Sequence, residues 1–265
     1  MLLIRGRLDE AIAMFKRALD VDALNKGAVT GLIAANTDLG THDKVLQWFD
    51  YANKHGEMLD VDTLNVMKFQ YHISQGDKHQ ASDYLSQVSL GAEHGRGAND
   101  LIEGQKAYYQ EDHQSVVEAF ERLRHQDNMT EEAFYRLGGG RFAAQLAYAY
   151  KQLEMTDKLN ELLTSLENYL RSKQEEKINN PSHYYTMSLV KAVQGKTNEA
   201  FYYLQGAIDV GWVRAWEAEI DPIMKPLKEN IQFTLMIGGV KARLANMRVR
   251  MSEEEEFLLE GSEEI

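Results

Sequence analysis

The side chains that could do chemistry are few, and their spacing does not suit catalysis. The chain has eight histidines and no cysteine, which excludes thiolate metal sites, thiol nucleophiles and disulfides. No H-E-x-x-H pattern occurs and no two histidines lie four residues apart, so we predict no metal site and expect histidines in turns or in solvent. A histidine that senses pH stays open as a hypothesis, because imidazole titrates near neutrality.

Other catalytic signatures are missing from the sequence as well. The run Gly138-Gly139-Gly140 lacks the Lys-Ser/Thr that follows in a phosphate loop, so a helix end followed by a loop explains it better. No nucleophile elbow, dinucleotide fingerprint, kinase motif or cyclase motif occurs. We therefore expect no cofactor and no enzyme activity in this chain, and any activity would lie in a domain outside it.

Composition and charge restrict the classes of partner that the chain could bind. The 265 residues are 44% hydrophobic and 26% charged, which is enough apolar material to bury a core, and the formal net charge is −12. Residues 252–265 hold seven glutamates and no lysine or arginine, so we expect a solvated, mobile acidic tail there. No basic stripe runs along the rest of the chain, which argues against nucleic acid as a partner. No apolar stretch approaches the length of a membrane span.

A recurring spacing indicates which elements must position these side chains. A turn residue is followed at +5 by a small or aliphatic residue, at +9 by an aromatic or leucine, and at +12 by another small or aliphatic residue. The first copy is Gly6, Ala11, Phe15 and Ala18. The turn position then recurs at Gly40, Gly76, Glu111, Glu154 and Gly195.

A second stretch with helical apolar spacing precedes each later turn, as in Leu146-Tyr150-Leu153 before Glu154. Each unit is therefore predicted to be a pair of helices, and neither helix can bury its apolar face without stacked neighbours. This pattern resembles the tetratricopeptide repeat family, a two-helix repeat of about 34 residues with an A-x₃-F signature in its second helix. The family's usual proline after the second helix and the tryptophan of its first helix are missing here.

The resemblance implies an all-α fold, a right-handed superhelix over residues 1–210 with about five and a half helix-pair repeats. The first repeat is truncated to its second helix, so we expect the missing helix upstream of Met1 in a longer parent protein. Three segments interrupt the pattern and are predicted to be widened loops between repeats: Leu90–Gly97, Gly138–Gly140 and Ser172–Asn180.

Residues 211–251 are predicted to form C-terminal capping helices. Asp221-Pro222 has the pattern of an N-cap with proline in the first turn. We expect Leu227, Ile231 and Phe233 to cover the last repeat, and a final helix over Val240–Met251 after Gly238-Gly239. Its cations Lys241, Arg243, Arg248 and Arg250 fit either a membrane or acidic-partner contact, or charges favoured near a helix C-terminus.

This ending resembles that of repeat arrays in bacterial winged-helix transcriptional regulators and class III adenylate or guanylate cyclases. The residues that carry the resemblance are Gly211-Trp212, Asp221-Pro222, Pro226-Leu227, Phe233 and the helix over Ala242–Arg250, whereas Asn230-Ile231 replaces the usual aspartate-proline ahead of the phenylalanine. In those families a DNA-binding, cyclase or kinase domain lies upstream, often across a membrane helix, and the repeat domain acts as a sensor or interaction module.

The concave surface lined by the first helices of the repeats is the predicted binding groove. Tyrosine offers contact area at low entropic cost and glutamine can bond a peptide backbone, which suits an extended or helical peptide. The alternative is that several of these tyrosines pack between helices. Projecting the first helices gives the candidate groove residues Gln70, Gln105, Tyr109, Arg141, Tyr148, Lys151 and Tyr185.

The sequence thus predicts a module that binds a protein or peptide, the sensory or interaction part of a larger bacterial signalling protein such as a transcriptional regulator. A stand-alone scaffold or assembly factor, and a regulatory domain of an attached cyclase or kinase, stay open as alternatives. A homodimer also stays open. The compartment is cytoplasmic, or periplasmic if an upstream membrane helix is attached.

Overall fold

The computed structural model describes residues 2–56, 58–88, 96–176 and 180–263, and every regular element in these ranges is a helix. The elements are α1 (Leu8–Val21), α2 (Lys26–Leu39), α3 (His42–Lys54), α4 (Val61–Ser74), α5 (Lys78–Ser86), α6 (Arg96–Tyr109), α7 (His113–Arg124), α8 (Glu131–Arg136), η2 (Leu137–Gly140), α9 (Arg141–Gln152), α10 (Thr156–Glu175), α11 (Pro181–Val193), α12 (Thr197–Asp209), α13 (Ala215–Ile220), η3 (Pro222–Leu227) and α14 (Ile231–Glu263). Within the described part of the chain, no helix is both long and apolar enough to cross a bilayer.

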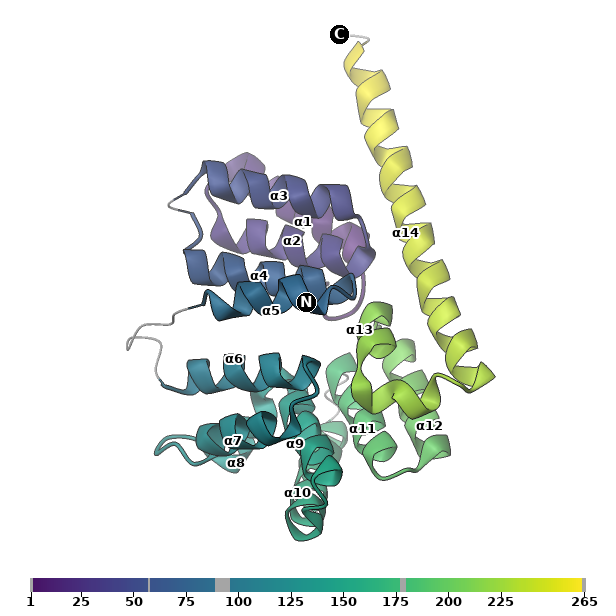
Figure 1. Cartoon of the computed structure of the whole chain (residues 1–265). Coiled ribbons are helices and arrows are strands. Elements are labelled where there is room, and N and C mark those ends of the chain that lie inside the picture. The colour runs from purple at the N-terminus through teal and green to yellow at the C-terminus, as the bar shows by residue number, and fades with distance from the viewer. Residues whose placement is uncertain (1, 57, 89–95, 177–179, 264–265) are drawn as a thin grey trace.

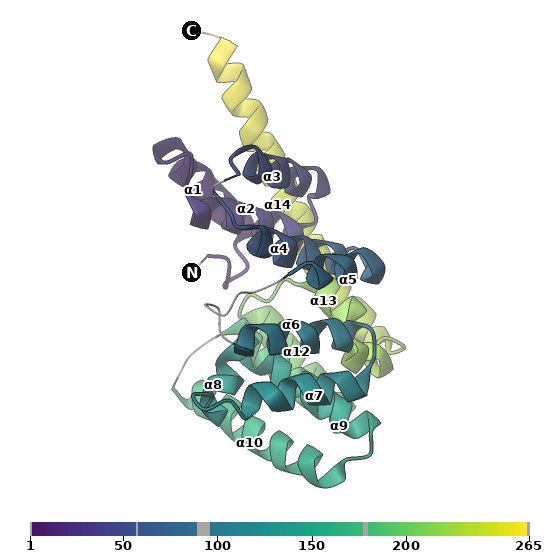
Figure 2. The same ribbon diagram turned by 60° about the vertical axis from the view of Figure 1, so that its left-hand side comes forward.

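The predicted helix pairs are present as neighbouring helices in contact. α2 packs against α3, α4 against α5, α6 against α7, α9 against α10, and α11 against α12. Figures 1 and 2 show α1–α5 stacked as one group and α6–α12 as a second group, with α13 between the two and α14 running along α1–α5. The structure is therefore all-α, as the apolar spacing predicts.

The turn positions of the repeat share one backbone geometry. All six have positive φ, from 57° to 76°, whether the residue is glycine or, in two copies, Glu111 and Glu154. Those two are the only non-glycine residues with positive φ in the described ranges. After each of the last five turns, the next N–H donates to the carbonyl five residues earlier, for example from Thr41 to Asn36 at 3.0 Å, which is the Schellman ending of a helix.

The repeated small and aromatic positions form the contacts between helices. The +5 residues Val45, Ala81, Val116 and Ala200 are fully buried. On α6, a Cβ at Gly104 would lie 2.2 Å from the ring of Phe120 on α7, so these helices approach too closely for any larger residue. Spacing along the sequence thus predicts which face of each helix packs in the core.

The interruptions differ in part from their prediction. Gly138–Gly140 ends a short helix pair, α8 with η2, and leads into α9, but α8 itself was not predicted. The polar segment predicted as a loop from Ser172 begins inside α10, which continues to Glu175. Most of the first predicted loop, within residues 89–95, and residues 177–179 of the third lie outside the described residues.

The C-terminal elements follow the predicted order with two corrections. Asp221 caps η3, with its Oδ1 accepting from the N–H of Ile223 at 2.9 Å, and Leu227 and Phe233 are buried as predicted. Ile231 was expected to cover the last repeat but is 70% exposed, because it is the first residue of α14.

The last helix begins at Ile231 rather than at Val240. It continues through Gly238-Gly239, where an added Cβ would meet nothing within 4 Å, and the backbone of residues 252–263 prolongs it. The acidic tail over residues 252–265 is predicted to be mobile. The side chains of residues 253–265 and the backbone of residues 264–265 lie outside the described part of the structure.

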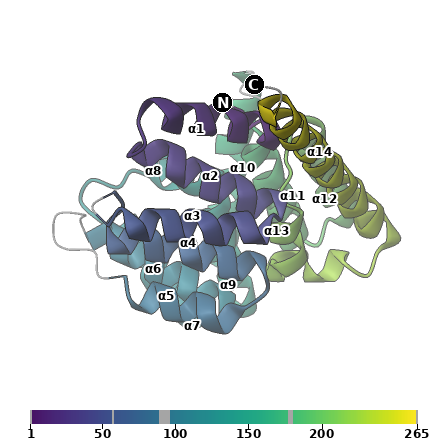
Figure 3. The same cartoon turned by 90° about the horizontal axis from the view of Figure 1, so that it is seen from above.

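The last helix packs against the first two helices, and Figure 3 shows α14 beside α1 and α2 from above. α14 contacts α1, α2 and α12. Its arginines bind N-terminal elements: Arg243 donates to the Gly6 carbonyl at 3.3 Å, Arg248 to the Leu39 carbonyl at 2.6 Å, and Arg250 pairs with Asp9 at 2.6 Å. The interpretation of these cations as helix C-terminal charges is wrong, because the helix continues to Glu263 and their partners belong to the same chain.

Candidate functional site

The segment that follows the last helix pair crosses the inner face of the molecule. Its contact with the first repeats is made by Asp38, at the end of α2, which accepts from Arg214 Nε at 3.1 Å and from Trp216 Nε1 at 3.0 Å. The Asp38 side chain is only 12% exposed. Arg214 and Trp216 follow Asp38 in the sequence by 176 and 178 positions. This bridge therefore connects the C-terminal segment to the N-terminal helices.

The same segment also contacts the later first helices. On α6, the Tyr108 hydroxyl donates to Asp221, and on α9, Arg141 pairs with Glu217. On α11, Tyr185 stacks on Trp212 with ring centroids 4.7 Å apart and an interplanar angle of 16°. Much of the inner surface that the sequence predicts for a ligand is therefore occupied by residues 212–221 of the chain itself.

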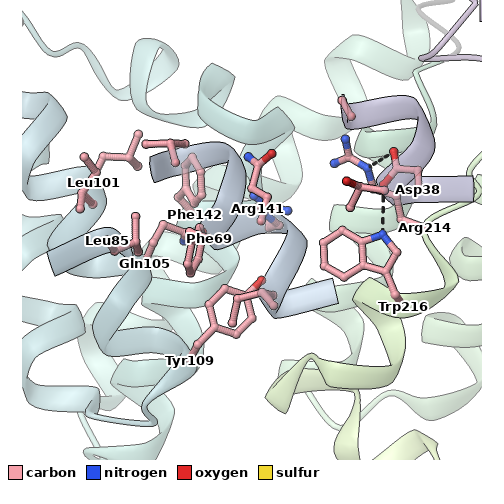
Figure 4. A pocket seen from close by; sticks show the side chains of 16 residues that line it. Asp38, Phe69, Leu85, Leu101, Gln105, Tyr109, Arg141, Phe142, Arg214 and Trp216 are labelled. Atoms are coloured by element: carbon pink, nitrogen blue, oxygen red, sulfur yellow. Dashed lines mark hydrogen bonds and ion pairs between the residues drawn. The ribbon is translucent and has the colours of Figure 1, made fainter. Parts of the chain in front are cut away.

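One unoccupied part of this surface is a cavity of about 170 Å³, here called the anchor cavity, between α1–α5 and α6–α13. Figure 4 shows that one end is apolar and the other polar. Phe69, Leu85, Leu101 and Phe142 lie at the apolar end, whereas Asp38, Arg214 and Trp216 lie at the polar end, with Arg141 between the two ends. A cavity of this kind suits a ligand that is apolar at one end and polar at the other.

An open groove of about 570 Å³ between α2 and α4 leads to the anchor cavity. The two share Ala34, Val66 and Gln70 in their lining. The Gln70 side chain is exposed, so its amide is accessible at the point where the groove meets the cavity. A peptide bound in the groove could therefore direct one of its side chains into the anchor cavity.

A second cavity of about 310 Å³, here called the inner cavity, lies beside the anchor cavity. It is bordered by the turn at Leu3-Ile4, by the first turn of α11 and by residues 211–214. Ala34, Asp38, Arg141 and Arg214 border both cavities, so the two adjoin at these residues.

The structure brings together four of the seven predicted groove residues. Gln70, Gln105, Tyr109 and Arg141 all line the anchor cavity. Gln105 and Tyr109 are largely buried, 8% and 6% exposed, and the Gln105 amide donates to Gln145. Tyr109 therefore packs between helices, as the alternative interpretation predicts, while one part of it still faces the cavity.

The other three predicted residues lie elsewhere. Tyr185 lines the inner cavity together with Arg141 and is 3% exposed. Tyr148 and Lys151 border neither cavity. The Tyr148 ring packs edge-on against His113 at 5.5 Å, and Lys151 Nζ donates to the carbonyl of Val193. The seven residues therefore do not line one cavity, since the C-terminal segment and helix packing separate them.

Two ion pairs dominate the electrostatics of this region. Burial alone would lower the pKa of Arg141, but Glu217, together with Tyr109 and Asp221, raises that pKa above its ordinary value. Asp38 raises the pKa of Arg214 in the same way, against the effect of burial. Both guanidinium groups are therefore held in the charged form, and two cations face two carboxylates around the cavities.

A third carboxyl group lies behind these pairs. Asp221 is 2% exposed, and burial raises its pKa to about 6 although the Tyr108 hydroxyl and the Ile223 N–H both donate to it. Burial likewise raises the pKa of the Tyr109 and Tyr185 phenols, so both stay protonated at neutral pH.

Sequence reasoning did not assign Asp38, Glu217 or Trp216 to the site. Asp38 lies two residues before a repeat turn and has no local feature that distinguishes it from a solvated helix residue. Asp221 was recognised as a cap only. The histidine expectation also needs one correction: His183 is buried, 7% exposed, and burial followed by the nearby Lys173 lowers its pKa.

Comparison with models of known protein families gives no match for this chain. A search of the curated proteins gives no significant match either.

Proposed function

We propose that this chain is a tetratricopeptide-type superhelix that binds a peptide segment of a partner protein. One large apolar side chain of the partner enters the anchor cavity, while the adjoining backbone lies in the groove between α2 and α4. The common turn geometry and the helix pairs support the repeat assignment.

The apolar end of the anchor cavity is the observation that carries this proposal. A cavity of about 150 Å³ lined by leucine, isoleucine and phenylalanine is known to bind benzene, so about 170 Å³ holds a group the size of one leucine or phenylalanine side chain. The cavity is too small for a whole peptide, and its two arginines are already paired with Glu217 and Asp38, which disfavours a phosphate. It therefore fits an anchor residue, with recognition of the backbone left to exposed amides such as Gln70.

The wider context is part of the same proposal. The ending over residues 211–251, with its resemblance to arrays in bacterial transcriptional regulators and cyclases, supports a role as the interaction or sensory module of a larger signalling protein. The chain binds and does not catalyse, and the two cations at the site, Arg141 and Arg214, are paired with Glu217 and Asp38 rather than free for nucleic acid. A stand-alone scaffold, or a module that regulates an attached cyclase or kinase, uses the same cavity.

A peptide library displayed on phage tests the proposal. Selection on the wild-type chain should enrich peptides with one large apolar residue, and a synthetic copy of the best peptide is then measured by fluorescence anisotropy. Leu101→Trp fills the apolar end of the cavity, and Leu46→Trp, at an exposed site on α3, is the matched control.

Burying one such side chain contributes about 1.5–3 kcal/mol, so Leu101→Trp should weaken the peptide about 10-fold to 100-fold. Leu46→Trp should bind like the wild type. No enrichment of apolar residues, or equal affinity for Leu101→Trp and the wild type, would contradict the proposal.

A further inference from the structure

The last helix, α14, has apolar residues on two opposite sides. One set is buried against the rest of the molecule: Phe233, Ile237, Val240, Leu244 and Met247. With about 100° of rotation per residue, a second set lies on the other side of the helix. This set, here called the outer stripe, comprises Ile231, Leu235, Gly238, Ala242, Ala245 and Val249. A helix at the surface of a monomer needs only one apolar side, so the outer stripe requires its own explanation.

The outer stripe is accessible from solvent. Its large residues Ile231, Leu235 and Val249 are 70%, 69% and 55% exposed. A Cβ added to Gly238, in the middle of the stripe, would meet nothing within 4 Å. Figures 1 and 3 show α14 at the outer edge of the molecule, with the other helices on one side of it. Large apolar side chains exposed along one line are typical of an interaction surface.

The spacing of the outer stripe indicates what kind of element fits on it. From Ile231 to Val249 its members are separated alternately by four and by three residues. This is the heptad spacing of helices that pack along one another in a coiled coil. At about 1.5 Å per residue, the stripe is about 27 Å long. Its occupant is therefore another helix, aligned with α14 over about that length.

The outer stripe complements itself when it is turned end to end. In an antiparallel pair centred between Gly238 and Ala242, each of these two residues lies opposite the other in the second copy. The backbones can then approach closely at the centre, because both residues are small. Further out, the large Leu235 lies opposite the small Ala245, and towards the ends Ile231 lies opposite Val249. A surface that matches itself about a twofold axis is what a homodimer requires.

Charge favours the antiparallel over the parallel arrangement. Residues 253–256 are four glutamates, and a parallel pair would bring these two acidic sequences side by side. An antiparallel pair instead places each near the start of the other α14, where the sequence has Lys225 and Lys228 and the helix dipole is positive. Lys241, close to the twofold axis, already pairs with Glu219 at 2.6 Å, so two copies of it add little repulsion.

We propose that two copies of this chain associate through their outer stripes, as an antiparallel pair of α14 helices. The two molecules do not collide, because each lies on the side of its α14 opposite the stripe. The anchor cavity is lined by residues between Ala34 and Trp216, so the dimer leaves it open and presents two such cavities to a partner. Two linked sites favour a partner that carries two peptide segments.

Sedimentation equilibrium of the whole chain over a range of concentrations tests the proposal. A stripe of six residues per copy is small for a stable interface, so the expected dissociation constant is about 1–100 µM. Leu235→Glu places a charge in the stripe of both copies and should weaken the dimer about 100-fold or more. Leu46→Glu, at an exposed leucine on α3, is the matched control and should dimerise like the wild type.

Ala242→Leu distinguishes close packing from general apolar adhesion. The position is exposed in the single chain, so the variant should unfold in urea like the wild type when both are dilute. In the dimer, leucine would separate the two helices at their closest point and should weaken association about tenfold or more. Adhesion without defined packing would instead become stronger, because the surface becomes more apolar.

Cysteine crosslinking tests the orientation, since the chain has no cysteine of its own. A mixture of Ile231→Cys and Val249→Cys should form a disulfide between two chains under mild oxidation. Each variant alone should not, because its two cysteines would lie about 27 Å apart in the antiparallel pair, and a disulfide needs Cα atoms within about 7 Å. Crosslinking of Ile231→Cys to itself as fast as in the mixture would overturn the antiparallel pair.

Three sedimentation results would overturn the dimer itself. The first is a wild-type chain that stays monomeric up to about 300 µM, which would leave the outer stripe to a different protein. The second is equal association of Leu235→Glu and the wild type. The third is tighter association of Ala242→Leu. The proposed peptide binding is judged separately, because Leu235→Glu should bind the selected peptide as the wild type does.

Discussion

The buried carboxyl group of Asp221 should make the stability of the molecule depend on pH. It lies between Tyr108 on α6 and the start of η3, and both the phenol and the Ile223 N–H donate to it. Glu217 adds a second negative charge nearby and Arg141 a positive one. Burial outweighs the hydrogen bonds and raises the pKa to about 6, compared with about 3.9 for an aspartate in an unfolded chain.

The direction of the effect follows from proton binding. Between these two pKa values the folded state binds this proton and the unfolded state does not, so the free energy of unfolding falls as the pH rises through that window. A shift of about two units corresponds to about 3 kcal/mol in total, of which about 1.4 kcal/mol is lost between pH 5 and pH 8. The penalty is complete above pH 7.

Asp221→Asn isolates this term, because asparagine keeps an oxygen acceptor for Tyr108 and Ile223 but does not ionise. Urea unfolding followed by circular dichroism at pH 5, 6, 7 and 8 gives the free energy of unfolding of the variant minus that of the wild type. This difference should rise by about 1.4 kcal/mol from pH 5 to pH 8. Asp20→Asn, at an exposed position on α1, controls for the loss of one negative charge. A difference that stays flat, or that falls as the pH rises, would refute the reasoning.

Three further substitutions probe the bridge, the turns and the last helix. Asp38→Ala leaves the indole N–H of Trp216 without its acceptor and should lower the free energy of unfolding in urea by about 2–4 kcal/mol. Asp38→Asn should lower it less, and equal losses for the two variants would count against the bridge. Glu154→Gly relieves a residue with φ of 57° and should raise that free energy by about 1 kcal/mol, whereas a decrease would show that the backbone there is unstrained. Arg248→Met removes the donor to the Leu39 carbonyl and should speed amide hydrogen exchange in α14 but not in α9. Unchanged exchange in α14 would mean that this contact does not hold α14 against α2.

Much of the local structure is predictable because it depends on short-range spacing. The turn positions illustrate this best: Glu111 and Glu154 carry no glycine signal, yet their spacing from buried positions predicts the same turn, and both have positive φ. A glutamate is tolerated there because the following N–H closes the helix end whatever the side chain. The helix pairs and their buried faces follow from the same period.

The closure of the chain on itself is not predictable in this way. Asp38 and Trp216 are 178 residues apart, and their contact depends on a curvature that accumulates over all the intervening helices. The spacing of apolar residues does not specify that curvature. For the same reason Arg248 and Arg250 were interpreted from the sequence as contacts for a membrane or an acidic partner, or as charges near a helix C-terminus. Their partners are Leu39 at the end of α2 and Asp9 on α1.

The sequence predicts which helix face contributes to the candidate site, but not how much of that face stays accessible. Projection from the turns correctly placed Gln70, Gln105, Tyr109 and Arg141 on one inner face, since each belongs to the first helix of a pair. It did not show that the segment over residues 212–221 covers the rest of that face. A groove predicted from the sequence of such a chain therefore cannot be assigned a ligand until the position of the C-terminal segment is known.

Intermolecular nuclear Overhauser effects provide the most direct measurement on the anchor cavity. The tightest peptide from the phage library is prepared with a ¹³C-labelled methyl or aromatic group on its apolar residue and added to the wild-type chain. Contacts from that group to the rings of Phe69, Phe142 and Trp216 are the predicted result. Contacts only to residues on the outer helices, such as Leu46 on α3, would contradict binding in the cavity.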